Sequence, residues 1–388
     1  VIELAEKANI PIASTLLGLS AVPTGHSHFT GMVGLHGNYA PNIRTNECDV
    51  LIAVGMRFDD RVTGNLDYYA RQAKVIHIEI DPAEIDKNVK TEVAIVADAK
   101  IALNALLPKI AKNVHLGWLQ ELHQCDKVEY EKIIHKDITP VIEELTMGEV
   151  VHQISEKTKG EAILVTDVGQ NQMAGARYYR FKKRGHHITS GGLGTMGFAL
   201  PAAIGAKIGN PNEQVIALMG DAELDEGNIY ECLIEGYKHD LRNCWWIVDY
   251  NRQSLDATTA DRMFRRFDDI FETCGWRVIT LKHGKRLREA FAKPGGKALE
   301  EWIENCPNAD FAALTYLGGA AWRERLMRDI GKKRGVPALL AEYDDRALAR
   351  LMTNLGGHCI ETLIDAFARM DDYRPTLLLA YTVKGYGL

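Results

Sequence analysis

A strand–helix–strand unit between Gln214 and Asp256 constrains the fold of this chain most strongly. Its first apolar run, Val215 to Met219, ends in Gly220-Asp221. Its second apolar run, Cys244 to Val248, ends in the segment DYNRQ, which contains Asn251. Parallel strands joined by a right-handed crossover place their carboxyl ends side by side, and open α/β sheets bind ligands at that edge. The pattern therefore predicts that Asp221 and Asn251 meet at one edge of a parallel sheet.

The residue types at these strand ends point to a magnesium diphosphate. A carboxylate from Asp221, an amide oxygen from Asn251 and the carbonyl of Gln253 form a set of hard oxygen ligands suited to Mg²⁺, with phosphate oxygens and water completing the shell. Gly220 fits a backbone that turns sharply close to the phosphate, where a Cβ would obstruct it. The alternative is an ordinary strand–helix–strand unit with a Gly-Asp turn.

The longer string GDAELDEG…DYNRQSLD resembles the diphosphate motif of thiamine diphosphate enzymes. It departs from that motif at Ala222, where a third glycine is common, and at Asp249, where a second asparagine is common. Asp249 adds a negative charge near a phosphate, so its protonation or orientation has to accommodate the ligand. By resemblance, the expected cofactor contacts are Val168, Gly169, Gln170, Asn171, Gly194, Met196, Gly220, Asp221, Ala222, Glu223, Asn251 and Gln253.

Composition limits the classes of function. The 388 residues, 46% of them hydrophobic, can bury a sizeable core and suggest two or three domains. A net charge of −6 with interleaved signs gives no nucleic-acid or membrane patch. Seven scattered cysteines without a CxxC motif indicate reduced thiols in a cytoplasmic protein, and no apolar run is long enough to cross a bilayer.

The remaining pattern predicts two parallel-sheet α/β (Rossmann-like) domains joined by a helical linker. The expected boundaries are a first domain over residues 1–112, a linker over 113–145 and a second domain over 146–388. The first is predicted from apolar runs that alternate with helical stretches, at Ile10 to Ser14, Asp49 to Gly55, Lys74 to Asp81 and Glu92 to Asp98. In the second, residues 311–331 and 359–372 are predicted to form helices outside the sheet, and the final strand, from Pro375, is expected beside Ile247.

The strings GMVGLHGNYAPN, VGMRFDDRVTG and IHIEIDPAEIDKN resemble the central domain of the acetolactate synthase large subunit, which holds FAD in that family. Two arginines could neutralise a pyrophosphate, and two carboxylates could accept from ribose or adenine. The resemblance implies flavin contacts at Thr15, Leu16, Gly34, Leu35, His36, Gly55, Arg57, Asp59, Arg61, Glu79, Asp98, Ala99, Gln172, Met173, Gly191 and Gly192. The alternatives are a vacant FAD fold, a solvated salt-bridge loop at Arg57 to Arg61, and a metal at His26, His28 and His36, which is disfavoured.

The strings GQNQMAGARYYR and SGGLGTMGFALPAAIGAKIG also resemble acetolactate synthase. In that family a residue at the position of Met196 props thiamine diphosphate into its bent, reactive shape. For an isolated methionine, core filling would be the simpler interpretation; the surrounding GGLGTMG string favours the family role.

Beyond Asp221 the resemblance changes. Residues 1–221 resemble acetolactate synthase, whereas residues 220–388, including LGGH and the terminal AYTVKGYG, resemble the thiamine-binding domain of homodimeric pyruvate dehydrogenase and transketolase-like proteins. We therefore expect a chimera that lacks a pyrimidine-binding domain. In these families that domain carries the glutamate that activates the cofactor, so no catalytic residue is identified. The chain is expected to form a homodimer or to bind a partner chain that supplies the domain.

The resemblance implies a thiamine diphosphate- and Mg²⁺-dependent enzyme that acts on pyruvate like acetolactate synthase, by decarboxylation and transfer of a two-carbon unit to a 2-oxo acid, in branched-chain amino acid biosynthesis. One alternative is a pyruvate dehydrogenase- or transketolase-like thiamine component. Another is a non-catalytic cofactor-binding fragment that needs a partner chain. The isolated chain is expected to be weakly active or inactive.

Overall fold

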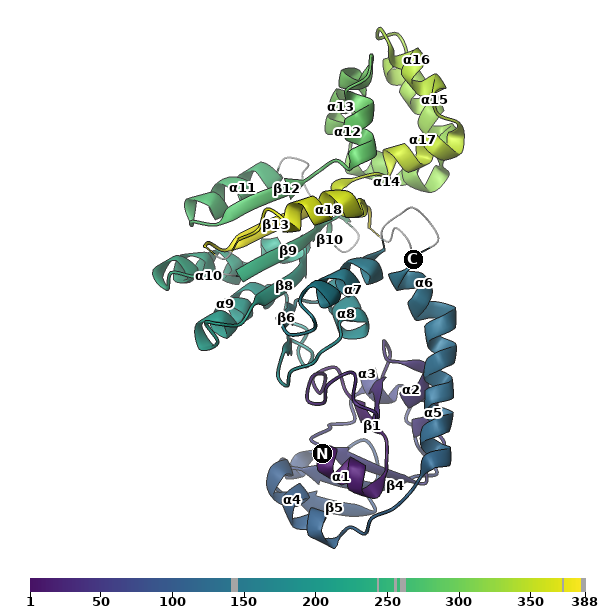
Figure 1. The fold of residues 1–388 in the computed structure, drawn as a ribbon, viewed down its shortest axis with the longest axis vertical. Coiled ribbons are helices and arrows are strands. Elements are labelled where there is room, and N and C mark those ends of the chain that lie inside the picture. Colours follow the sequence, from purple (N-terminus) through teal and green to yellow (C-terminus); the bar gives the residue numbers. More distant parts are fainter. Residues whose placement is uncertain (141–145, 243, 255–256, 259–262, 372, 385–388) are drawn as a thin grey trace. The chain divides into compact units, whose positions relative to one another are not determined.

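The computed structural model describes residues 1–140, 146–242, 244–254, 257–258, 263–371 and 373–384. The chain forms two compact units (Figure 1). Unit 1 comprises Val1–Asp137, Ile154–Glu161 and Ala176–His187, and unit 2 comprises Ile138–Gln153, Ala162–Gly175 and Ile188–Leu388. Each unit contains parallel strands and helices, so the predicted α/β class is confirmed. The domain boundaries at residues 112 and 145 stay a prediction.

Unit 1 contains a three-stranded parallel sheet in the order β3-β4-β5 and a separate parallel pair, β1-β2. The predicted apolar runs form β1, β3, β4 and β5, and β2 is a strand that the pattern did not predict. The strands are β1 (Ile12–Ser14), β2 (Phe29–Met32), β3 (Val50–Val54), β4 (Lys74–Glu79) and β5 (Val93–Val96). The helices that precede the linker are α1 (Ile2–Ala8), α2 (Tyr39–Thr45), α3 (Asp60–Thr63) and α4 (Ala99–Leu106).

The predicted linker is helical where the structure describes it. It contains α5 (Leu116–Glu129), a π-helical turn (Tyr130–Ile134) and α6 (His135–Ile138). A buried ion pair joins Arg177 to Glu129, and the same carboxylate accepts the backbone N–H of Tyr39 at 2.9 Å. These contacts hold α5 against the rest of unit 1.

Unit 2 is built on a six-stranded sheet in the order β12-β13-β9-β8-β6-β7. The pairs β12–β13, β13–β9, β9–β8 and β8–β6 are parallel. The strands are β6 (Ile163–Thr166), β7 (His187–Thr189), β8 (Val215–Gly220), β9 (Cys244–Tyr250), β12 (Arg277–Leu281) and β13 (Thr376–Tyr381). Leu378 of β13 pairs with Ile247, as predicted for the final strand.

The core of unit 2 follows from strands that are apolar on both faces. The five residues Val215 to Met219 are all buried, which is the pattern of a parallel strand covered by helices on both sides. Trp246 of β9 is fully buried against Phe271 and Trp276. The helices along this sheet are α7 (Met147–Lys157), α8 (Gln170–Tyr178), α9 (Ala199–Gly209), α10 (Gly227–Lys238), α11 (Met263–Thr273) and α18 (Ile360–Phe367).

A group of six helices is inserted between β12 and β13 and lies beyond the sheet in unit 2 (Figure 1). We call it the helical insertion; it contains α12 (Lys285–Phe291), α13 (Gly296–Asn305), α14 (Asn308–Leu317), α15 (Gly319–Ile330), α16 (Val336–Ala341) and α17 (Asp345–Met352). The prediction of one helix over residues 311–331 is wrong, because Gly318 has a φ of +85° and separates α14 from α15. The buried Trp322 packs against Phe311 and Trp302 to form its core.

No helix of the described residues is both long enough and apolar enough to cross a membrane.

The buried His187 generates a prediction about acid stability. Its ring packs against Phe181, with the ring centres 5.1 Å apart, and burial lowers its pKa to about 4. The unfolded chain takes up a proton on this ring near pH 6.5, whereas the folded chain resists protonation until about pH 4. The stability that this group contributes is therefore complete above the unfolded pKa and is lost as the pH falls. When the pH falls from 7.5 to 5, the free energy of unfolding, measured with urea, should decrease by about 2 kcal/mol more in the wild type than in His187→Leu. An equal loss in both proteins would contradict the prediction.

Candidate functional site at the strand ends of unit 2

The sheet order of unit 2 brings the predicted site residues to one edge. The chain runs from β6 to β7 on one side and then returns to β8 on the other side of β6, so β6 is the point where the strand order reverses. Ligands of open α/β sheets bind at such a point. Asp167 follows β6, Asp221 follows β8 and Asn251 follows β9, and these three strands are parallel neighbours.

The ends of β8 and β9 contact each other directly. Gly220 pairs with Asp249 in the sheet, and the backbone N–H of Arg252 donates a hydrogen bond to the Asp221 carboxylate. Arg252 has a φ of +63°, in the left-handed region, so the chain turns directly after Asn251. The strand ends therefore meet as the sequence predicts, and the roles of Asp221 and Asn251 as metal ligands stay a prediction.

Asp249 has partners that accommodate its additional charge. The hydroxyl of Thr382, which follows β13, donates to its carboxylate, and the Asn251 side chain also hydrogen-bonds to it. Burial nevertheless raises the pKa of Asp249, because removal from water disfavours its charged form. The residue that departs from the family motif is thus tied to the predicted metal ligand Asn251.

Two more carboxylates lie at the same edge. Burial raises the pKa of Asp167 to about 6 although its oxygens accept from the backbone N–H groups of Val168 and Ala199, at 3.0 and 2.8 Å. Burial and the charge of Asp167 raise the pKa of Glu223 to about 8. Burial and the charge of Asp249 raise the pKa of Asp221 to about 7. These four acidic residues, Asp167, Asp221, Glu223 and Asp249, are the carboxylate cluster.

Gly220 is needed for a reason that the sequence did not reveal. A Cβ at this position would lie 2.6 Å from Oε2 of Glu223, so the carboxylate occupies the space that a side chain would need. Glycine therefore permits Glu223 to fold back over the end of β8. The prediction assigned that space to a phosphate.

The segment after β6 offers polar groups for an anion or a cofactor. Asn171 is 7% exposed, and its Nδ2 donates to the Val168 carbonyl at 3.1 Å. Its Oδ1 is buried and has no hydrogen-bond partner among the described residues. Gly169 has a φ of +106° and open space where a Cβ would stand. The orphaned oxygen, the open glycine and the negative cluster fit a ligand that brings a cation and hydrogen-bond donors.

The other predicted cofactor contacts are close to these strand ends in the sequence. Gln170 is the first residue of α8, and Ala222 begins a 3₁₀ turn after Asp221. Gly194 is exposed and Met196 is half-buried in the segment before α9. Gln253 begins the short strand β10 (Gln253–Ser254), which pairs with β11 (Ala257–Thr258). Of the terminal KGYG motif, residues 385–388 lie outside the described residues.

Asn308 is a residue of this site that sequence reasoning missed. It stands at the start of α14, is 6% exposed, and its Nδ2 donates to the carbonyls of Asn251 at 3.4 Å and Arg252 at 3.2 Å. The Arg252 guanidinium also lies 5.8 Å from the ring centres of Phe311 and Tyr381. The helical insertion therefore holds the turn that carries the predicted metal ligand. The motif gave no signal for this contact, because Asn308 lies outside it; Asp167, also missed, could have been found as the acidic residue that ends β6.

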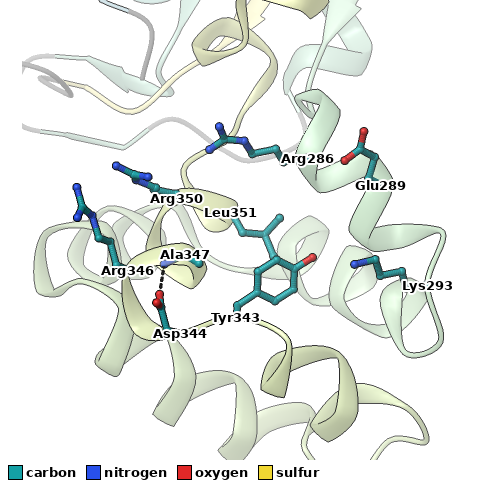
Figure 2. Close-up of a pocket in the computed structure, with 9 residues that line it drawn as sticks. All are labelled: Arg286, Glu289, Lys293, Tyr343, Asp344, Arg346, Ala347, Arg350 and Leu351. Carbon is teal, nitrogen blue, oxygen red and sulfur yellow. Dashed lines mark hydrogen bonds between the residues drawn. The ribbon is translucent and has the colours of Figure 1, made fainter. Parts of the chain in front are cut away.

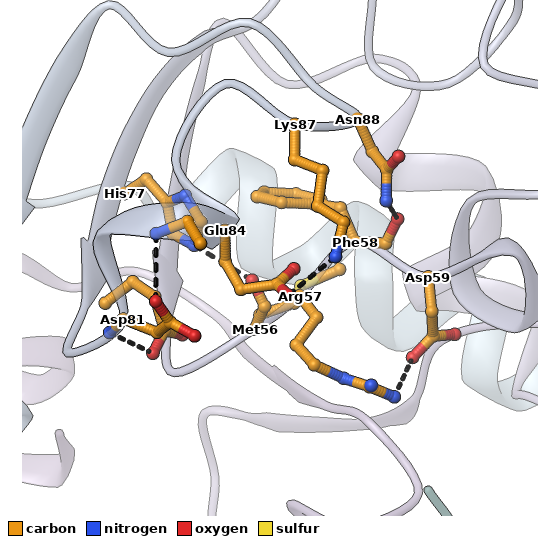
Figure 3. A network of polar contacts seen from close by, with 11 residues as sticks. Met56, Arg57, Phe58, Asp59, His77, Asp81, Glu84, Lys87 and Asn88 are labelled. Carbon is orange, nitrogen blue, oxygen red and sulfur yellow. Dashed lines mark hydrogen bonds and ion pairs between the residues drawn. The ribbon is translucent and has the colours of Figure 1, made fainter. Parts of the chain in front are cut away.

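In unit 1, most of the expected flavin contacts follow the ends of strands. The loop after β3 is held by His77, which donates to the Met56 carbonyl at 2.8 Å, and by Asn88, which donates to the Phe58 carbonyl at 2.9 Å (Figure 3). On this loop Arg57 pairs with Asp59 at 3.4 Å, and the Arg57 side chain is 53% exposed. The pair matches the salt-bridge alternative and also leaves a guanidinium accessible to a ligand.

The remaining flavin positions divide between the two units. In unit 1, Glu79 is buried and accepts from the N–H groups of Ile80 and Asp81, at 2.8 and 3.2 Å, and Asp98 caps α4. The other positions in unit 1 are Thr15, Leu16, Gly34, Leu35, His36, Gly55, Arg61 and Ala99. Gln172, Met173, Gly191 and Gly192 belong to unit 2, where Gln172 donates to Thr189 at 2.7 Å.

The described residues contain no group of three or more His, Cys, Asp or Glu side chains arranged to hold a metal ion. A metal at Asp221 would therefore need amide, carbonyl, water or phosphate oxygens to complete its shell. This agrees with the predicted ligand set, which combines one carboxylate with one amide and one carbonyl oxygen.

The carboxylate cluster predicts how stability depends on pH. Folding raises the pKa of Asp221 to about 7. The contribution of Asp221 to the free energy of unfolding is therefore complete below the unfolded pKa, near 4, and is lost as the pH rises through 7. The metal-free Asp221→Asn protein should therefore gain stability over the wild type, on the order of 2 kcal/mol more at pH 8 than at pH 5. Urea unfolding at both pH values measures the gain. Asp240→Asn, at an exposed aspartate of the same unit, is the control, and a pH-independent difference at Asp221 would refute the assignment.

The Asn308 contact predicts a coupling between the helical insertion and the strand ends. Asn308→Leu removes both hydrogen bonds to the turn, so the Mg²⁺ affinity should fall roughly tenfold, which is about 1.4 kcal/mol. Titration of the protein with Mg²⁺ in a calorimeter measures the change. Asn305→Leu is the matched control, because Asn305 is exposed and its Nδ2 donates to the carbonyl of Glu301 in its own helix. Equal affinities of the two variants would show that the contact does not support the site.

Comparisons with known proteins agree with this geometry. Residues 1–106 match the thiamine pyrophosphate enzyme central domain, and residues 167–227 match the C-terminal thiamine pyrophosphate-binding domain. The second match spans the segment after β6 and the end of β8, which contain Asp167, Asn171 and Asp221.

The chain is also similar to acetolactate synthases. It is 45% identical over 225 residues to a probable acetolactate synthase large subunit of Methanocaldococcus jannaschii, covering 57% of this chain and 38% of the relative. The Lactococcus lactis large subunit is 44% identical over 255 residues, covering 64% and 42%. Acetolactate synthase 2, chloroplastic, of Nicotiana tabacum is 44% identical over 357 residues, covering 84% and 52%. The chain thus spans about half the length of these relatives or less.

The matched domains and the site geometry lead to one assignment. This chain carries the central domain of thiamine pyrophosphate enzymes and part of their thiamine pyrophosphate-binding C-terminal domain, and it resembles the acetolactate synthase large subunit.

Proposed function

We propose that this chain binds thiamine diphosphate through Mg²⁺ at the ends of β8 and β9 and acts on pyruvate as part of an acetolactate synthase-like enzyme. The reaction would be decarboxylation and transfer of the two-carbon unit to a second 2-oxo acid, as in branched-chain amino acid biosynthesis. The substrate class rests on the resemblance to acetolactate synthases, which are named for their product.

The observation that carries the proposal is the carboxylate cluster. Four buried acidic groups at one sheet edge repel one another, and a divalent cation would relieve that repulsion. The Asp221 carboxylate already lies against the turn after Asn251. A structural role alone would not require acidic side chains whose pKa values are all raised by their surroundings.

The residues of this chain would divide the work of binding. Asp221 and Asn251, with the carbonyl of Gln253, would hold the metal. Asn171 would offer its Oδ1, which is unpaired among the described residues, to a hydrogen-bond donor of the cofactor. Gly169, which has no neighbour in the described part of the chain where a Cβ would stand, would let the cofactor come close to the backbone. When bound, thiamine diphosphate supplies addition to the keto carbon of a 2-oxo acid and an electron sink for its decarboxylation.

Unit 1 would hold FAD or retain a vacant FAD fold. The match to the central domain and the rigid loop that presents Arg57 support this part of the proposal. Arg57 and Arg61 would neutralise the pyrophosphate, and a carboxylate oxygen of Glu79 or Asp98 would accept from ribose or adenine.

The second half of the chain supports a second candidate, a pyruvate dehydrogenase- or transketolase-like thiamine component. The C-terminal family match ends at residue 227, close to the expected junction at Asp221, whereas the similarity to acetolactate synthase 2 of Nicotiana tabacum covers 84% of this chain and so extends beyond it. A chimera of the two families would keep the diphosphate site, because its ligands come from both sides of the junction. The protein would act in the cytoplasm, as a homodimer or together with a partner chain.

Calorimetry of thiamine diphosphate with and without Mg²⁺ tests the site. The wild type should bind only when Mg²⁺ is present, and Asp221→Ala should weaken that binding at least tenfold, about 1.4 kcal/mol. Glu231→Ala removes an exposed carboxylate of α10 in the same unit and should leave the affinity unchanged. Magnesium-independent binding, or equal loss in both variants, would overturn the proposed metal site.

Turnover of pyruvate by the isolated chain tests the need for a partner. We expect little or no acetolactate or CO₂, because no described residue of this chain is assigned the role of the carboxylate that activates the cofactor. Robust product formation by the pure protein would show that the isolated chain is a complete enzyme. No binding of thiamine diphosphate at all would favour the non-catalytic alternative.

A further inference from the structure

The helical insertion contains a cavity that no step of the proposed reaction uses. It has a volume of about 520 Å³ and is lined by residues of α12, α17 and the loops that flank them (Figure 2). This volume lies within the range of small-molecule sites, roughly 300–1,000 Å³. We call it the insertion pocket.

Four cationic side chains from three segments line the insertion pocket: Arg286 of α12, Lys293 of the loop after it, and Arg346 and Arg350 of α17. Figure 2 shows the three arginines on one side and Lys293 on the other. Arg346 and Arg350 are one helical turn apart, an arrangement of like charges that costs a few tenths of a kcal/mol in a helix. A bound anion would remove this cost.

Two nearby carboxylates have partners other than the cations of the pocket. Asp344 caps α17, with its Oδ1 accepting from the N–H of Ala347 at 2.7 Å, and Asp345 pairs with Arg323 at 2.8 Å. Glu342 pairs with the lining residue Lys293 at 2.7 Å, so the three arginines are the main source of positive charge for a ligand. Arg346 is exposed and forms no ion pair within the described part of the chain. Glu289 is the remaining carboxylate of the lining, and it lies on the Lys293 side (Figure 2).

The walls of the pocket are fixed by backbone contacts. A Cβ on Gly295 would lie 2.5 Å from the Gly335 carbonyl carbon, so the loop after Lys293 packs directly on the loop before α16. The N–H of Arg286 donates to Oδ1 of Asn354 at 3.0 Å, which ties the start of α12 to the end of α17. These contacts hold the cationic segments at fixed positions, and preorganisation of this kind favours ligand binding.

We propose that the insertion pocket binds a small organic phosphate. A guanidinium such as that of Arg346 matches the oxygens of a phosphate in geometry and charge, and a phosphate has more terminal oxygens to accept N–H donors than a carboxylate. Tyr343 and Leu351 supply apolar surface for the organic part of the ligand, and the Lys293 ammonium lies 5.5 Å from the centre of the Tyr343 ring. The proposal is independent of thiamine chemistry, because the lining residues belong to the helical insertion alone.

Inorganic pyrophosphate is the probe, titrated calorimetrically into the full chain in buffer with EDTA, so that no metal bridges it to the carboxylate cluster. The wild type should bind one equivalent saturably at the insertion pocket, counted as the binding that the arginine variants of this pocket weaken, since the loop of Arg57 and Arg61 could bind a further pyrophosphate. R346Q should weaken binding at least threefold, and R346Q/R350Q at least tenfold. Far-UV circular dichroism checks the fold, and the single variant changes only an exposed side chain. D221A should bind as the wild type does, which separates this test from that of the proposed function.

R334Q is the matched control, because Arg334 is an exposed arginine of the helical insertion outside the pocket. Its affinity should stay within twofold of the wild type. An equal loss of pyrophosphate affinity in R334Q would show that binding depends on general surface charge. Absence of saturable binding at millimolar pyrophosphate would show that the pocket is not an anion site. Tighter binding of citrate than of pyrophosphate would indicate that the pocket prefers a polycarboxylate to a phosphate. Each of these three results would overturn the proposal.

Discussion

The hydrogen bond from the Arg252 backbone to the Asp221 carboxylate is the interaction on which the site of this protein depends. It joins the ends of two neighbouring parallel strands, and Arg252, which donates it, stands in the left-handed region with a φ of +63° directly after Asn251. Around it, buried carboxylates are held by backbone amides and by Thr382, yet their pKa values stay raised. Backbone N–H groups thus stabilise the negative charge of the carboxylate cluster only in part. The site is therefore suited to bind a cation.

The helical insertion adds support that strand order alone would not provide. Asn308 donates to the two carbonyls of the Asn251–Arg252 turn, and the Arg252 side chain lies between Phe311 and Tyr381. A segment inserted between β12 and β13 therefore contacts the turn at the end of β9. Because the same segment also contains the cationic insertion pocket, one part of unit 2 combines a structural contact with the proposed cofactor site and a separate proposed anion site.

Much of the fold could be predicted because parallel strands leave a strong pattern. Runs such as Val215 to Met219 are apolar on both faces, so they can only be covered strands, and the pairing of Leu378 with Ile247 followed from the same pattern. The sequence failed where a local conformation decided the outcome. Gly318 divides a predicted helix by adopting a positive φ, and the short strand β2 exists because it pairs with β1. Neither event has a periodicity that a sequence pattern could display.

For the site, the sequence by itself determined which chemical groups stand at the strand ends, because an acidic or amide residue after an apolar strand is visible in one dimension. It placed Asp221 and Asn251 together through the rule for parallel crossovers. Only the tertiary structure decided that Glu223 fills the space over Gly220 and that Asn308 holds the turn. The reason is distance along the chain: burial, repulsion between carboxylates and contacts between separate elements exist only when the folded chain excludes water and brings these residues together.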